Sequence, residues 1–168
     1  MNRKVIILIH LSAATIAFLT ILSLFVSSLT ADLLGDKQVL RQVKTIIVYC
    51  LPILFIVMPT LGITGNKLAG KSTNPIVQRK LKRMKFIMLN GLLLTFLAIF
   101  LYRMAISGEF TQLFYSIQLM ELTAGATNLT LLGLMFKDGF TLSGRIRKKS
   151  AGQLLQKKTT LGTKVWFL

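Results

Sequence analysis

His10 is the one histidine of the chain and lies within a long apolar run, where a polar side chain is costly unless it has a partner. The residues three, four and seven positions after it share its helical face, and all are alanines: Ala13, Ala14 and Ala17. Small residues let a second helix, or a flat cofactor, approach the histidine closely. Because imidazole is an axial ligand of haem iron, His10 is the candidate cofactor-binding residue and haem b the candidate cofactor.

Glu121 is a carboxylate within another apolar run, and a carboxylate in such a position is a candidate for moving protons or solutes. Polar or small residues share its helical face: Gln118, Gly125 and Asn128. The alternative is structural: a hydrogen bond to Gln118 or a threonine, or a charge pair with Arg103 or a neighbouring subunit. The polar candidates within the apolar runs are Glu121, Asn128, Gln118 and Asn90.

Depth along the helices decides which of these residues can meet. At a rise of about 1.5 Å per residue, Asn90 and Asn128 fall into one layer near the same side of the membrane, together with His10. In that layer the asparagines suit interhelical hydrogen bonds worth about 0.5–2 kcal/mol each. Glu121 lies closer to the opposite side, so we expect no direct pair between His10 and Glu121.

A four-helix membrane bundle with a histidine in one span resembles the b-type cytochromes in general architecture, and His10 alone carries this resemblance. Those proteins hold haem between histidines on facing helices, whereas this chain has no second histidine. The resemblance therefore implies electron transfer with His–Met ligation, five-coordinate iron, or a histidine from a partner. Met84 and Met88 lie at a suitable depth to be the methionine.

The composition is that of a membrane protein. Of the 168 residues, 53% are hydrophobic and 15% charged, against about 25% charged in globular proteins, and the mean hydropathy is +0.66. The apolar residues gather in blocks long enough to span a bilayer, which takes about 20 residues. We therefore predict an all-α integral membrane protein in which residues 1–136 form a transmembrane domain, with spans at 5–29, 45–65, 86–102 and 113–136.

The distribution of cations sets the predicted topology. The N-terminus, residues 66–85 and residues 137–168 hold two, seven and eight Lys and Arg, while the other two connections hold three and one. Because cytoplasmic segments carry the excess of Lys and Arg, both termini and the central loop are predicted to be cytoplasmic. The spans then form an antiparallel bundle in the inner (plasma) membrane, with a basic cytoplasmic loop at 66–85 and a basic cytoplasmic tail at 137–168.

The net charge of +16 is interpreted as contact with anionic lipid rather than with nucleic acid, because the cations flank apolar spans. Residues 76–85 have a helical pattern whose apolar side chains, among them Met84, can lie on the membrane surface while the cations reach the headgroups. The predicted lipid contacts are Arg79, Lys80, Lys82, Arg83, Lys85, Arg145, Arg147, Lys148 and Lys149.

Glycine and proline mark the expected connections. Gly35 and Gly108 are turn residues, Asn74 with the following proline marks a turn, and Gly62–Asn66 has the composition of a helix end. Pro52 and Pro59 lie within the second span, where prolines shape a helix by removing backbone donors.

Catalytic motifs are lacking in the sequence: it has no nucleophile elbow, no phosphate-binding loop and no metalloprotease motif, and one His and one Cys exclude a His/Cys zinc site. We therefore predict a non-catalytic accessory or assembly subunit of a larger membrane complex, whose partner is another membrane protein or a second copy. The alternatives are the haem-binding electron-transfer protein using His10 and, third, proton or solute translocation using Glu121.

Overall fold

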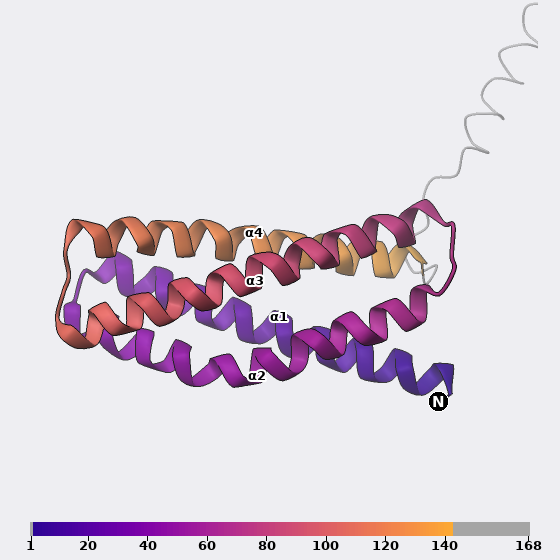
Figure 1. The fold of residues 1–168 in the computed structure, drawn as a ribbon, viewed down its shortest axis with the longest axis horizontal. Helices are drawn as coiled ribbons and strands as arrows, with labels where there is room; N and C mark the ends of the chain where they lie inside the picture. The colour runs from indigo at the N-terminus through magenta and orange to yellow at the C-terminus, as the bar shows by residue number, and fades with distance from the viewer. Residues whose placement is uncertain (1, 143–168) are drawn as a thin grey trace, which may run out of the picture. The chain divides into compact units, whose positions relative to one another are not determined.

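The computed structural model describes residues 2–142, and within that range it contains four helices and no strand. The all-helical class predicted from the sequence is confirmed. The chain divides into two compact units, residues 1–135 and 136–168, and the packing described below belongs to the first. Figure 1 shows the helices of this unit lying side by side. The helices are α1 (Arg3–Leu34), α2 (Lys37–Ala69), α3 (Pro75–Ser107) and α4 (Gln112–Leu142).

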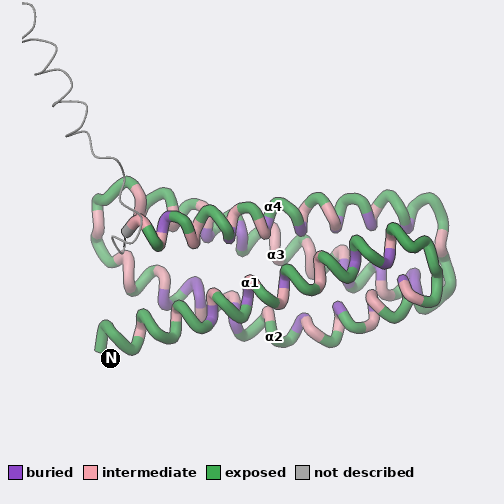
Figure 2. The backbone as a smooth tube through the Cα atoms, turned by 180° about the vertical axis from the view of Figure 1, so that it is seen from behind, coloured by how far each residue is buried: buried purple, intermediate pink, exposed green. Residues whose placement is uncertain are grey.

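All four helices are long and apolar enough to cross a membrane. The shortest has 31 residues, which at about 1.5 Å per residue gives about 45 Å, against about 30 Å for the hydrocarbon core of a bilayer. Much of their surface is apolar and exposed: Leu8, Leu33 and Ile56 are 65%, 79% and 72% exposed. Figure 2 shows that exposed residues cover much of each helix. Apolar surface on this scale is typical of contact with lipid or with another protein.

The helix ends have the turn chemistry predicted from the sequence. Gly35 and Gly108 end α1 and α3 with φ of 66° and 74°, in the left-handed region that favours glycine. The side chain of Asp36 accepts hydrogen bonds from the backbone N–H groups of Gln38 and Val39, in the first turn of α2. Asn74 caps α3 in the same way, and Pro75 occupies the first helical position, where its missing N–H costs nothing.

The helix end predicted at Gly62–Asn66 is wrong, because α2 continues to Ala69. The reason is packing. A Cβ on Gly65 would lie 2.9 Å from the Sδ atom of Met84 on α3, so the glycine makes room for this side chain. Met84 is accordingly buried against α2, whereas we had expected it on the membrane surface.

Each helix buries one stripe of residues against its neighbours. The alanine face of α1 packs on α2, where Ala13 and Ala17 form a cluster with Val57 and Leu61. This is the close helix contact that the alanine spacing predicts. Near the Gly35 turn a second cluster draws on all four helices, with Phe114 of α4 completely buried. Within residues 112–135, the buried positions of α4 recur every three or four residues: Phe114, Gln118, Glu121, Gly125, Asn128 and Leu132.

Candidate functional site

An ion pair between Lys44 of α2 and Glu121 of α4 lies in the interior of the helices. Lys44 is 0% exposed and Glu121 7%. Arg103 is one of the alternative partners that the sequence indicates for Glu121, and the structure shows Lys44 as its charge partner instead. The pair brings two opposite charges together where water cannot solvate them, so each depends on the other.

Ser28 of α1 joins the ion pair and uses all of its hydrogen-bonding capacity. Its hydroxyl donates to Glu121 Oε2 at 3.3 Å, which leaves two lone pairs. These accept from Lys44 Nζ at 3.0 Å and from Gln118 Nε2 at 3.1 Å. The four side chains, which we call the Lys44 cluster (Ser28, Lys44, Gln118 and Glu121), therefore tie α1, α2 and α4 together at one point.

Lys44 and Ser28 are the members of this cluster that the sequence interpretation missed. The sequence places Lys44 in a polar connection, because it is the last cation before the second apolar run. The helix begins earlier, at Lys37, so that Lys44 lies two turns inside α2. One feature of the sequence does point to Lys44. Glu121 lies about as far from the start of α4 as Lys44 does from the start of α2, and a buried carboxylate requires a partner at its own depth.

Asn90 of α3 and Asn128 of α4 form the interhelical hydrogen bond that their depth predicts. Asn90 Nδ2 donates to Asn128 Oδ1 at 3.0 Å and to the backbone oxygen of Ala124 at 2.8 Å. Asn128 is 1% exposed. The bond to Ala124 identifies the nitrogen of Asn90, because a carbonyl oxygen only accepts. The atom of Asn128 that faces Asn90 is therefore its oxygen.

His10 of α1 is hydrogen-bonded to Thr64 of α2, with 2.8 Å between Nδ1 and Oγ1. The hydroxyl of Thr64 donates its only hydrogen to the backbone oxygen of Thr60 at 2.6 Å. It must therefore accept from His10, so Nδ1 carries the imidazole proton and, in the neutral ring, Nε2 holds a free lone pair. No His10–Glu121 contact is present in the described residues, as the depth argument predicts.

Met84 lies next to His10. A Cβ on Gly65 would be 2.9 Å from Met84 Sδ and 3.4 Å from His10 Cε1, so both side chains meet over this glycine. A histidine whose Nδ1–H is held by an acceptor keeps Nε2 available as a metal ligand, and the thioether of Met84 is a second, softer type of ligand. Within residues 2–142 no cluster of three or more His, Cys, Asp or Glu could hold a metal ion.

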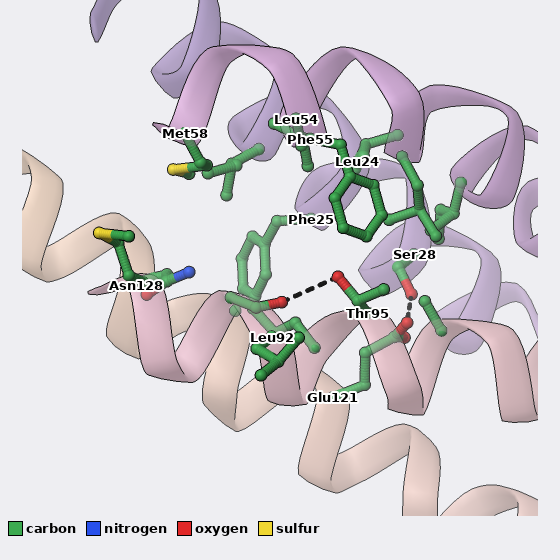
Figure 3. A pocket seen from close by; sticks show the side chains of 18 of the residues that line it. Leu24, Phe25, Ser28, Leu54, Phe55, Met58, Leu92, Thr95, Glu121 and Asn128 are labelled. Carbon is green, nitrogen blue, oxygen red and sulfur yellow. Dashed lines mark hydrogen bonds between the residues drawn. The ribbon is translucent and has the colours of Figure 1, made fainter. Parts of the chain in front are cut away.

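A cavity of about 360 Å³ lies beside the Lys44 cluster, among residues of α1, α2, α3 and α4. Figure 3 shows its walls, which are mainly aliphatic and aromatic, with Phe25 and Phe55 contributing rings. Glu121 and Asn128 are polar groups of the lining, and both come from the buried face of α4. The volume is in the range of about 300–1,000 Å³ found for small-molecule sites.

The basic residues predicted to contact lipid divide into two groups. Residues 79–85 belong to the first turns of α3, where Arg79, Lys82 and Lys85 are exposed and Lys80 and Arg83 are half-buried. The other four predicted contacts lie outside the described residues: Arg145, Arg147, Lys148 and Lys149.

Comparisons with known protein families, with curated proteins and with solved structures find no match for this chain. The function must therefore be argued from the residues themselves.

Proposed function

We propose that this chain is a multi-pass inner-membrane protein that acts without catalysis, as an accessory or assembly subunit of a larger membrane complex. One observation carries the proposal. The polar side chains within the helices bind one another: His10 binds Thr64, Asn90 binds Asn128, and Lys44 binds Glu121. Polar groups used in this way fix helix contacts, which is their usual role within membrane spans.

The proposed topology is an antiparallel four-helix bundle with both termini and the basic connection after α2 in the cytoplasm. The distribution of Lys and Arg along the sequence supports it, since 17 of the 21 lie on that side. The burial of Lys44 adds support, because a buried cation does not contact the outer side of the membrane. The cations left for that side are then only Lys37, Arg41 and Arg103. The exposed cations at the start of α3 would then contact anionic headgroups.

Partner capture from native membranes tests the proposed function. The full chain, tagged and expressed at native level, should be recovered from mild detergent as a complex larger than its own mass, with a defined second membrane protein or a second copy. A tagged, unrelated four-span protein expressed at the same level serves as the control for non-specific recovery. Recovery of the chain as a monomer from several mild detergents would refute the proposal.

Haem binding at His10 is the second candidate, favoured by the free Nε2 lone pair and the neighbouring Met84. If it is correct, the purified native protein has a Soret band, and dithionite produces sharp α and β bands. Replacement His10→Ala should abolish the spectrum, while Met84→Leu should keep the haem and change its axial ligation. A featureless spectrum of the native protein would eliminate this candidate and leave His10 as a packing residue.

A further inference from the structure

The cavity beside the Lys44 cluster has a free hydrogen-bond donor, the amide nitrogen of Asn128. The oxygen of Asn128 is occupied by Asn90, as argued above, and Nδ2 makes no hydrogen bond to any residue the structure describes. Asn128 is nevertheless 1% exposed. Figure 3 shows its nitrogen directed into the cavity, toward Phe25. The amide N–H₂ group faces the cavity without an acceptor among the described residues, so this nitrogen is suited to a ligand oxygen.

Glu121 offers an acceptor elsewhere in the same cavity. Its Oε2 atom holds both Lys44 and Ser28, whereas Oε1 makes no hydrogen bond within the described residues. Because Lys44 balances the charge of the carboxylate, the site has no net charge to attract an ion. The cavity therefore favours an uncharged ligand that can donate one hydrogen bond and accept another.

The spacing of these two groups defines the size of the ligand. Glu121 and Asn128 are seven residues apart on one face of α4, so their Cα atoms are separated by about 10 Å. Oxygens on opposite carbons of a six-membered aromatic ring are about 5–6 Å apart, and a hydrogen bond of about 3 Å at each end brings the total to about 11–12 Å. This length is comparable to the separation of the two residues along the helix. Flat rings also suit the lining, where Phe25 and Phe55 can pack against them.

We propose that this cavity binds the ring of a quinol, a neutral hydroquinone lipid. One hydroxyl accepts a hydrogen bond from Asn128 Nδ2, and the other donates to Glu121 Oε1. Phe55 of α2 and Leu92 of α3 line the cavity and are 58% and 49% exposed, so the cavity reaches the surface beside them and an apolar tail attached to the ring can leave there. A simple acyl chain fits the apolar walls but satisfies neither polar group. The proposal concerns binding and is independent of the accessory role.

Duroquinol, a tetramethyl hydroquinone without a tail, is the probe for the test. Its binding to the full chain in detergent is measured by anaerobic equilibrium dialysis, as the excess over empty micelles. The matched compound is the dimethyl ether of duroquinol, which keeps the ring and both oxygens but cannot donate to Glu121. We expect the ether to bind about tenfold more weakly, as the loss of one buried hydrogen bond predicts.

Two variants locate the site. Asn128→Leu removes the donor and should weaken duroquinol binding about tenfold. Gly91→Ala keeps Asn128 but adds a methyl group 3.9 Å from its Nδ2, an ordinary contact that the fold tolerates, and should weaken binding by narrowing the cavity. Gly133→Ala is the control, because its methyl group meets nothing within 4 Å. The proposal is overturned if folded protein binds no duroquinol at millimolar concentration, if the ether binds equally well, or if both variants bind like the unaltered chain.

Discussion

Lys44 and Glu121 are 77 residues apart in sequence, and their ion pair joins α2 to α4 inside the helical unit. Ser28 adds α1 to the same contact through its bonds to both charged groups. Three helices thus depend on one charged pair that is almost completely shielded from water. The stability of the fold should therefore be more sensitive to these two residues than to any surface charge.

Replacement of one partner should be far more damaging than replacement of both. Lys44→Met leaves the carboxylate buried and unpaired, which should lower the free energy of unfolding by about 3–5 kcal/mol. The double variant Lys44→Met/Glu121→Leu removes both charges and should recover most of that loss. The free energy of unfolding can be measured by circular dichroism during titration with SDS in mixed micelles.

Arg41→Met is the matched control for this experiment, since Arg41 lies one turn before Lys44 on α2 and is exposed. It should change the free energy of unfolding by less than about 0.5 kcal/mol. Glu121→Leu completes the cycle. If the double variant loses as much free energy of unfolding as Lys44→Met and Glu121→Leu lose together, the two charges do not depend on each other.

The close approach of α1 to α4 at Gly125 predicts a contrast between two glycines of α4. A Cβ on Gly125 would lie 3.1 Å from Cδ2 of Phe25, and a ring has little freedom to move away. Gly125→Ala should therefore destabilise the protein by about 1–3 kcal/mol. Gly133→Ala, with nothing within 4 Å, should be neutral or stabilising by up to about 1 kcal/mol, because alanine favours the helix. Thermal unfolding followed by circular dichroism compares the two, and equal effects would contradict the packing described here.

The sequence predicted those features of the fold that depend on residues close together in the chain. The apolar runs indicated four helices, Gly35 and Gly108 marked the turns, and the spacing of Ala13 and Ala17 identified a packing face. Gly65 was misassigned to a helix end, because glycine serves both as a helix terminator and as a site of close contact. Only the position of Met84 on another helix shows which applies.

The sequence predicted only part of the candidate site, because it shows the depth of a residue along its helix but not the contacts between helices. Asn90 and Asn128 could be matched, because each lies well within its apolar run, where depth can be counted reliably. Lys44 could not be matched to Glu121, because the start of α2 was placed after it. The cavity depends on side chains from four helices, and no spacing within one segment indicates where such surfaces leave a space.

The hydrogen bond between Asn90 and Asn128 should appear as an energetic coupling. Replacement of either residue by alanine should destabilise the protein, and Asn90→Ala should cost more, because Asn90 also donates to the backbone of Ala124. The double variant should be more stable than the sum of the single effects by about 0.5–2 kcal/mol. Equilibrium unfolding of the four proteins gives this coupling directly, and strict additivity would mean that the bond contributes nothing.

The proposed orientation can be tested with alkaline phosphatase, which forms its disulfides and becomes active only after export from the cytoplasm. Fusions after Gly35 and Gly108, where α1 and α3 end, should be active, while a fusion after Ser72 should be inactive. The excess of cations that precedes α3 is the physical cause, because Lys and Arg are retained on the cytoplasmic side. Replacement of Lys67 and Lys71, the loop cations that the Ser72 fusion retains, by glutamine should therefore raise the activity of this fusion, whereas replacement of Arg41 should not. High activity of the unaltered Ser72 fusion would reverse the proposed topology.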